Sequence, residues 1–191
     1  MIGNLALFGT SADPPTWGHQ ALLEGLLRLY PQVITWASNN PTKHHSAQLD
    51  HRVELLEALV DSIASPRLKL HQSLSSPWTT VTVNRAVTRW PNADLVVVIG
   101  SDLAGQLPHW KQAKDVLRQS RLAIAPRAGW PLRSSELEAI KRLGGKLDLL
   151  SLKIPASASS DVRHNLALDK VPYAVRRLLL KHNLYGIASS F

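Results

Sequence analysis

The residues near the start of the chain that are best suited to chemistry follow a short apolar run at residues 5–8. They are small or polar, and the set comprises Gly9, Thr10, Ser11, Thr16, Gly18 and His19. If the apolar run is a strand and a helix begins near Thr16, the helix start offers backbone N–H groups and a partial positive charge that favour an anion. His19 could add a donor aimed at phosphate oxygens, and Thr16 a hydroxyl. A tight turn with a capped helix explains the same residues equally well, because a single Gly-His pair is a weak signal.

Short β-rich runs alternate with longer stretches of helical period along most of the chain. We expect strands at residues 5–8, 33–37, 68–71, 95–99, 122–125 and 147–152. Such alternation is typical of βαβ units around a parallel sheet. The run at 95–99 is apolar without alternation, which predicts a central strand buried on both faces. The fold class we predict is α/β, a Rossmann-like, doubly wound parallel sheet with helices on both faces and a C-terminal helical segment.

Two stretches between the expected strands carry an apolar face at helical spacing. Residues 50–63 predict a helix, and Asp50 stands where an N-cap is expected. Leu22, Leu26 and Leu29 show the same spacing after the first strand. Ligands in doubly wound folds lie beyond the carboxyl ends of the strands, so the loops that follow the strands are where a site is expected.

The C-terminal third changes character and predicts a helical tail. Residues 157–161 would open one helix, and Pro172 is placed to start another that runs towards Asn183. No internal repeat, low-complexity tract or linker interrupts the sequence. Because 191 residues suit one domain of ordinary size, we expect a single domain over residues 1–191.

Composition narrows the classes of protein to consider. The chain has 45% hydrophobic and 19% charged residues, no cysteine and a net charge of +8. These values fit an ordinary globular protein and exclude a disulfide scaffold and thiol chemistry. The basic excess suits anionic partners, but it is scattered without a run of three Lys or Arg, which disfavours a nucleic-acid-binding tail. Without a secretory signal or a spanning apolar stretch, we expect a cytoplasmic protein that does not bind membranes.

Eight short segments along the chain combine polar, charged, aromatic and glycine residues that could form a binding site. They read Thr16-Trp17-Gly18-His19, Asn40-Pro41-Thr42-Lys43-His44, Asp50-His51-Arg52, Pro77-Trp78-Thr79, Ile99-Gly100-Ser101-Asp102, Leu107-Pro108-His109-Trp110, Arg127-Ala128-Gly129-Trp130 and Ser159-Ser160-Asp161-Val162-Arg163. This series resembles the bacterial nicotinate-nucleotide adenylyltransferases of the (H/T)-x-G-H nucleotidyltransferase superfamily. The match is collinear over nearly the whole chain, which makes it far more specific than any single segment.

The resemblance implies a reaction of NAD biosynthesis. The 5′-phosphate of nicotinate mononucleotide would attack the α-phosphorus of ATP, forming deamido-NAD and releasing pyrophosphate. Thr16, His19 and Arg163 would be catalytic, with Arg163 on the β- and γ-phosphates and Asp102 on the ribose hydroxyls. The ATP-binding residues that it implies are Gly9, Thr10, Ser11, Gly18, His19, Gly100, Asp102, Ser159, Ser160 and Arg163. Mg²⁺ is expected to accompany the triphosphate, bound mostly by phosphates and water, and no metal site built from the protein's own side chains is expected.

The acceptor side is implied by the same resemblance. The substrate-binding residues would be Lys43, His44, Trp78, Thr79, Trp110 and Arg127, of which the two Trp and the Thr would form a nicotinate pocket. Plainer explanations exist for several candidates: a buried Trp fills a core, a basic pair in a loop is solvated, Arg163 makes a surface ion pair and Asp102 caps a helix.

The first motif departs from the family pattern in a way that leaves the acceptor open. Thr10, Ser11 and Ala12 replace Gly, Thr and Phe, and Thr16 replaces a His; the later loop exchanges the order of its His and Lys. With threonine at position 16 the motif resembles that of related transferases, including phosphopantetheine adenylyltransferases. Nicotinamide mononucleotide or a phosphopantetheine-like group is therefore an alternative acceptor, and a non-catalytic basic nucleic-acid-binding domain is a second alternative. Homo-oligomerisation also stays open.

Overall fold

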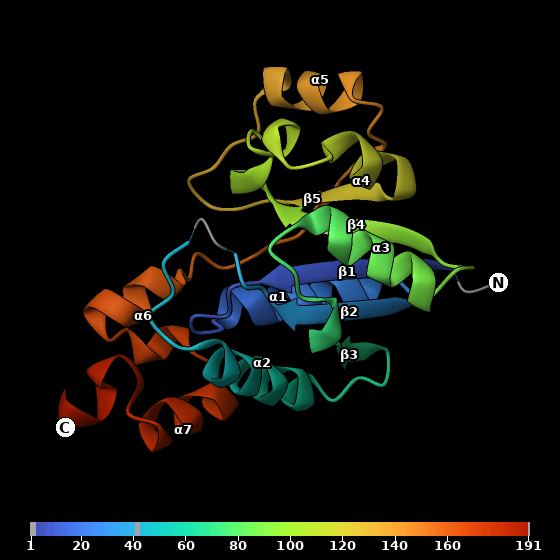
Figure 1. Cartoon of the computed structure of the whole chain (residues 1–191). Helices are drawn as coiled ribbons and strands as arrows, with labels where there is room; N and C mark the ends of the chain where they lie inside the picture. The colour runs from blue at the N-terminus through green and yellow to red at the C-terminus, as the bar shows by residue number, and fades with distance from the viewer. Residues whose placement is uncertain (1–2, 41–42, 191) are drawn as a thin grey trace.

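The computed structural model describes residues 3–40 and 43–190. Within them, six parallel strands form one sheet in the order β3-β2-β1-β4-β5-β6 (Figure 1). The strands are β1 (Asn4–Thr10), β2 (Gln32–Ala37), β3 (Leu68–Leu70), β4 (Asp94–Gly100), β5 (Arg121–Ala125) and β6 (Leu147–Leu149). The order runs outward in both directions from β1 and β4, so a topological switch point lies between these two strands. The predicted Rossmann-like α/β fold is confirmed.

Helices cover both faces of the sheet (Figure 1). One face carries α1 (Trp17–Leu29), α2 (Leu49–Ile63), α6 (Ser159–Asn165) and α7 (Tyr173–Lys181), and the other carries α3 (Thr79–Arg89), α4 (Ala113–Gln119) and α5 (Ser134–Arg142). Short 3₁₀ segments lie at Gln72–Leu74, Ser101–Leu103, Leu107–His109, Leu168–Lys170 and Leu184–Ser190, the last interrupted by non-helical backbone at Tyr185 and Gly186. In the described residues, no helix is both long and apolar enough to cross a bilayer.

Each strand divides its side chains between two core layers. In β1, Ala6 and Phe8 pack with α1 and α2, whereas Leu5 and Leu7 pack with α3 and α4. This alternation is the period of two that a strand imposes, and it explains why runs buried on both faces show no polar residues. β4 lies between β1 and β5, and its apolar residues 95–99 are at most 5% exposed, which confirms the predicted central strand.

Several predicted boundaries were wrong. Gln48 is the N-cap of α2, so Asp50 lies inside the first turn, where its carboxylate still faces the positive end of the helix dipole. Leu29, the last residue of α1, is 50% exposed although Leu22 and Leu26 are buried. Leu29 therefore does not share the buried apolar face that its spacing predicted.

The C-terminal elements are also shorter than predicted. β6 ends at Leu149 rather than residue 152, α6 begins at Ser159, and α7 ends at Lys181 before the predicted limit at Asn183. Residue Asn183 has a positive φ of 46°, a conformation that stops an α-helix.

Candidate active site

The loop between β1 and α1 presents its polar residues at the carboxyl end of the central strands. Thr16 is the N-cap of α1 and His19 is the third residue of the helix. The main-chain N–H of Thr16 donates a hydrogen bond to Nδ1 of His19 at 3.1 Å, and the Thr16 hydroxyl lies 2.9 Å from the same nitrogen. The pair forms a capping box in which a histidine replaces the usual Glu or Gln.

This capping box fixes the state of the His19 ring. A main-chain N–H can only donate, so Nδ1 must accept and the proton of the neutral ring lies on Nε2. Burial, together with the smaller effects of the positive charges of Arg127 and Lys43, lowers the pKa of His19 to about 4. At neutral pH, His19 is therefore an uncharged hydrogen-bond donor through Nε2–H, and it cannot serve as a base through Nδ1.

Ser157, distant in sequence, forms hydrogen bonds with the first turn of α1. The Gly18 N–H donates to the Ser157 hydroxyl at 2.7 Å, and the Thr16 hydroxyl donates to the Ser157 carbonyl at 2.8 Å. A Cβ at Gly18 would lie 3.0 Å from that hydroxyl and 3.2 Å from the Pro155 carbonyl oxygen, so glycine makes room for this close approach. The sequence analysis did not assign Ser157 to the site, because no local pattern signals a partner 139 residues away.

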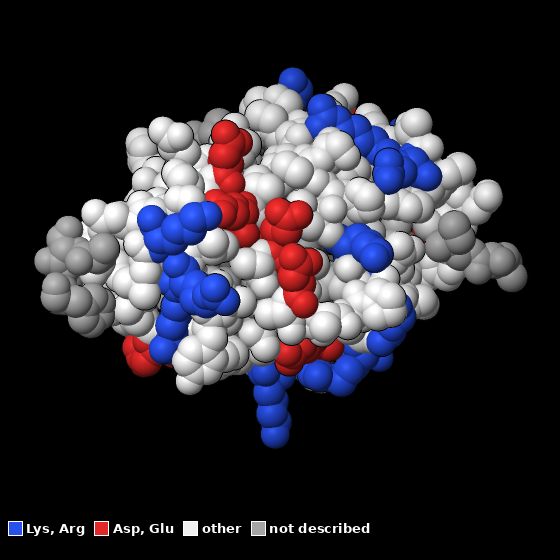
Figure 2. All heavy atoms as spheres, turned by 90° about the horizontal axis from the view of Figure 1, so that it is seen from below, with Lys and Arg blue, Asp and Glu red and all other residues white. Residues whose placement is uncertain are grey.

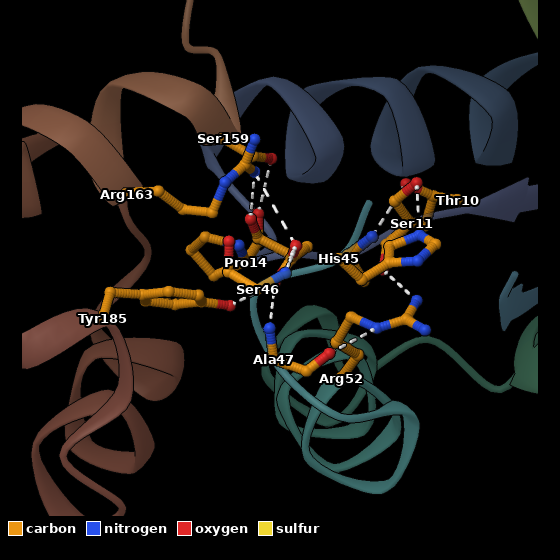
Figure 3. A network of polar contacts seen from close by, with 12 residues as sticks. Thr10, Ser11, Pro14, His45, Ser46, Ala47, Arg52, Ser159, Arg163 and Tyr185 are labelled. Atoms are coloured by element: carbon orange, nitrogen blue, oxygen red, sulfur yellow. Dashed lines mark hydrogen bonds and ion pairs between the residues drawn. The ribbon is translucent and has the colours of Figure 1, made fainter. Parts of the chain in front are cut away.

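Asp13, which the sequence analysis did not assign to the site, is the centre of the loop's polar network, and its partners Ser46, Ala47 and Tyr185 are labelled in Figure 3. Its carboxylate is buried and accepts hydrogen bonds from the Ser46 N–H at 2.8 Å, the Ala47 N–H at 3.1 Å and the Tyr185 hydroxyl at 2.7 Å. Burial is the main cause that raises the pKa of Tyr185, followed by its bond to Asp13. The carboxylate thus joins the loop after β1 to the loop after β2 and to the C-terminal segment.

Arg52 holds the same two loops from below the site (Figure 3). Although it is charged, it is 1% exposed. Nη1 donates at 2.8 Å to both the Ser11 and Ser38 carbonyls, and Nε donates to the Ala47 carbonyl at 3.2 Å. Burial lowers the pKa of this guanidinium, and the charge of Asp13 acts in the opposite direction. Buried charges are tolerated only where such donors are satisfied, so Arg52 is a structural support for the loops.

The start of α6 docks on the Asp13–Pro14 segment. Nη1 of Arg163 donates to the Asp13 carbonyl at 2.6 Å and lies 3.9 Å from the Asp13 carboxylate, and the Ser159 hydroxyl donates to the Pro14 carbonyl at 2.8 Å. Arg163 is 22% exposed, so it is not a solvated surface residue. Ser160, also predicted to bind phosphate, is the second residue of this helix.

Asp102 and Arg127 form an ion pair at the ends of β4 and β5. Nη1 of Arg127 lies 2.5 Å from Oδ2 of Asp102. The Ser101 hydroxyl positions the pair, because it accepts from the Arg127 N–H at 3.0 Å and donates to the Trp130 carbonyl at 2.7 Å. Gly100 leaves the space that the Asp102 carboxylate occupies, since a Cβ there would collide with it.

The three residues predicted to form a nicotinate pocket differ in burial and surroundings. Trp78 is 44% exposed, which rules out core packing as its role, and the Lys111 ammonium lies 5.0 Å from the centre of its ring. Trp110, the neighbour of Lys111, is partly buried against the core beneath α4. Thr79 is the first residue of α3.

The loop after β2 carries the predicted residues Lys43 and His44 and, next to them, His45, which the sequence analysis did not assign to the site. Lys43 and His44 are both exposed, whereas His45 reaches the site: its Nε2 lies 3.4 Å from the Ser11 hydroxyl. Burial lowers the pKa of His45, and the charge of Arg52 adds to the effect. The charge of Lys43 contributes to lowering the pKa of His19, so Lys43 lies near that ring. Pro41 and Thr42, part of the same predicted motif, lie outside the described residues.

Two of the predicted ATP-binding residues have structural partners within the loop. Gly9 lies against the indole of Trp36, which a Cβ would approach to 2.7 Å. The Thr10 hydroxyl accepts from the Ala12 N–H at 3.3 Å, and Ala12 takes a positive φ of 50°. Both residues shape the turn, and direct contacts to ATP stay predictions for them, as they do for Ser11.

Comparisons with known proteins agree with this arrangement. Residues 7–165 match the cytidylyltransferase-like family. A curated sequence from Synechocystis sp., named "Probable nicotinate-nucleotide adenylyltransferase", is 32% identical over 95% of this chain and 98% of its own length. One of the same name from Chlorobium phaeobacteroides is 29% identical over 95% and 98%. The fold is similar to that of the Plasmodium falciparum nicotinic acid mononucleotide adenylyltransferase complexed with NaAD, with a TM-score of 0.80, 18% identity and coverage of 97% and 98%.

Proposed function

The chain belongs to the cytidylyltransferase-like family and, within it, to the nicotinate-nucleotide adenylyltransferases, and from this premise we propose that it transfers the AMP group of ATP to nicotinate mononucleotide. The 5′-phosphate of the mononucleotide attacks the α-phosphorus, the bond to the β-phosphate oxygen breaks, and deamido-NAD and pyrophosphate leave. The observation that carries the proposal is a neutral histidine donor, His19, held at a helix start at the end of β1. Such chemistry needs positioning and charge neutralisation, with no covalent intermediate on the protein.

His19 is the residue that we place against the α-phosphate. Its Nε2–H donates to a non-bridging oxygen, and charge builds up on that oxygen as the attacking phosphate approaches. Because Nδ1 is already engaged by Thr16, the ring is oriented before substrate binds and needs no reorganisation during the reaction. Lys43 and Arg127, whose charges already act on His19, supply positive potential around the same phosphates.

Arg163, with Ser159 and Ser160, is suited to the β- and γ-phosphates. A guanidinium carries five N–H donors, so Arg163 can bind phosphate oxygens while it keeps its bond to the Asp13 carbonyl. That bond orients the side chain, and the Asp13 carboxylate at 3.9 Å balances its charge in the absence of substrate. A triphosphate would compete with this carboxylate for the guanidinium, which favours release of pyrophosphate after the reaction.

The remaining predicted residues are suited to the ribose of ATP and to the nicotinate group of the acceptor. Asp102, with a carboxylate that is 13% exposed at the switch point, is placed to accept hydrogen bonds from ribose hydroxyls. Trp78 offers an exposed ring face for stacking on the nicotinate, and Thr79 offers an N–H at the start of α3 for the nicotinate carboxylate. Trp110 would complete the pocket wall.

A divalent cation is expected with ATP, as part of the substrate, and Mg²⁺ is our proposal. The two carboxylates of the site are already engaged, Asp13 by four groups and Asp102 by Arg127. The ion would therefore be held mainly by phosphate oxygens and water, where it neutralises charge on the leaving pyrophosphate. We further propose a cytoplasmic location.

The acceptor is tested with ATP and Mg²⁺ against three candidates offered separately: nicotinate mononucleotide, nicotinamide mononucleotide and phosphopantetheine. We expect fastest pyrophosphate release with nicotinate mononucleotide. Release with phosphopantetheine alone would refute the proposed acceptor. The nucleic-acid alternative has little support on the face formed by α2 and α7, where acidic side chains lie between separate groups of basic ones (Figure 2).

A further inference from the structure

Three metal-ligating side chains meet between α2 and α7, outside the residues assigned above to the substrates. His51 and Glu54 are three residues apart on α2 and so share one face of that helix. His182 is the C-cap of α7. One ligand atom from each side chain lies within 4.8 Å of the other two, and all three side chains are half-buried. The centres of the two imidazole rings are 4.8 Å apart.

The His182 ring lies against the Glu54 carboxylate in a close contact that does not have hydrogen-bond geometry. Its Nε2 is buried and makes no hydrogen bond to any group in the part of the chain that the structure describes. It nevertheless lies 2.8 Å from Oε2 of Glu54, too close for two lone-pair atoms unless a proton or another cation separates them. The Lys181 ammonium is 3.8 Å from the other Glu54 oxygen, so it competes with a metal ion for the carboxylate, but its side chain is 65% exposed and does not block the site.

We propose that His51, Glu54 and His182 bind a Zn²⁺ ion. Two imidazole nitrogens and one carboxylate oxygen, with water in the fourth position, are a common zinc ligand set, whereas Mg²⁺ prefers oxygen ligands throughout. Ligand bonds of about 2.0–2.2 Å place the donors of a tetrahedral ion about 3.4 Å apart. The observed 2.8 Å separation and 4.8 Å limit bracket this value, so small side-chain rotations complete the site.

The ion would join the two elements that support the Asp13 loop. Arg52, directly after His51, bonds the Ser11 carbonyl, and Tyr185, three residues after His182, bonds the Asp13 carboxylate. A metal link between α2 and α7 therefore fixes both supports relative to one another. Its main effect is on stability, because none of the three ligands is placed on a substrate.

The test uses the full chain, stripped with a chelator and dialysed, and titrated with Zn²⁺ by calorimetry and thermal unfolding. We expect one ion per chain, a Tm increase of about 5 °C or more at 100 times Kd, and no comparable effect of Mg²⁺. Co²⁺ should give the visible absorption bands of a tetrahedral site. His182→Gln and His51→Gln should each remove the bands and the Tm increase, whereas the exposed His109→Ala should keep both.

Lys181→Gln should change the affinity for Zn²⁺ in the opposite direction from the histidine variants. Removing the competing ammonium from Glu54 should tighten Zn²⁺ binding several-fold, while the Tm of the metal-free variant shows that it is folded. If His182→Gln proves unstable, Glu54→Gln and the Co²⁺ spectrum of His51→Gln provide the same test. Zn²⁺ binding with equal affinity in the wild type and in both folded histidine variants would overturn the site.

Discussion

The Thr16 main-chain N–H donates to Nδ1 of His19, and this single hydrogen bond determines which nitrogen of the ring faces the substrate. The bond forces the proton of the neutral ring onto Nε2, while burial and the charges of Arg127 and Lys43 keep the ring neutral. A histidine in a capping box is thus converted from an acid–base group into a fixed donor. The mechanism proposed above depends on this conversion.

Substitutions at His19 separate a fixed donor from a proton-transferring group. His19→Ala removes the donor and should lower kcat by about 10²- to 10³-fold, the effect of removing one donor from a developing oxyanion. His19→Gln places an amide N–H near the position of Nε2, and it should recover about 10- to 150-fold of that loss, since a hydrogen bond to a charged group contributes about 1.5–3 kcal/mol. Steady-state kinetics with circular dichroism to check folding measure both. Equal activity of the Gln and Ala variants would show that proton transfer, rather than donation, is required.

The depressed pKa of His19 predicts a defined pH dependence of stability. The ring takes up a proton near pH 6.5 in the unfolded chain but only near pH 4 in the folded one. Above pH 6.5 the His19 ring is neutral in both the folded and the unfolded chain, so it does not make stability depend on pH there. Between pH 6.5 and about 4 the unfolded chain binds more protons, so the free energy of unfolding falls as the pH is lowered. Urea unfolding of wild type and His19→Gln at several pH values should show the wild type losing relative stability across this window. A constant difference between the two proteins would contradict the shifted pKa.

Asp13 should be far more important for folding than its position in a loop suggests. Asp13→Asn replaces an acceptor with an amide that faces the N–H groups of Ser46 and Ala47, and it should cost about 1–3 kcal/mol. The matched control is Asp161→Asn, whose carboxylate pairs with Lys170 nearer the surface and should cost about 1 kcal/mol or less. Urea unfolding midpoints compare the two. Similar midpoints would mean that the Asp13 network does not support the loop.

Trp78 should affect the mononucleotide and not ATP. Because the ring is 44% exposed, Trp78→Ala should leave the Tm nearly unchanged. Loss of aromatic stacking, worth about 0.5–1.5 kcal/mol, should raise the KM for nicotinate mononucleotide roughly 2- to 10-fold. Trp78→Phe keeps a ring and should restore most of the affinity. An increase in the KM for ATP of the same size in Trp78→Ala would remove this residue from the acceptor pocket.

The sequence was sufficient for the parts of the molecule governed by local patterns. Short β-rich runs between stretches of helical period located all six strands within a few residues, and Thr16 and His19 lie at the predicted helix start after the first strand. Element ends were less accurate, because residues such as Gln48 cap a helix only through the path of the preceding loop.

The supports of the site could not be predicted because their partners are distant in sequence. Ser157 reaches Thr16 and Tyr185 reaches Asp13 only after the chain has folded, and nothing local marks either residue. Arg52 belonged to a motif quoted in the sequence analysis, but the sequence does not show that two loops bury it and accept its hydrogen bonds.

The most direct test of the proposed reaction follows each phosphate of ATP with nicotinate mononucleotide as acceptor. With ATP labelled at the α-phosphorus, we expect the label in a dinucleotide product whose mass is that of deamido-NAD. With ATP labelled at the γ-phosphorus, we expect the label in pyrophosphate and none in the dinucleotide. Label from the γ-phosphate on the mononucleotide, or release of labelled orthophosphate without dinucleotide, would show that the enzyme catalyses a different reaction.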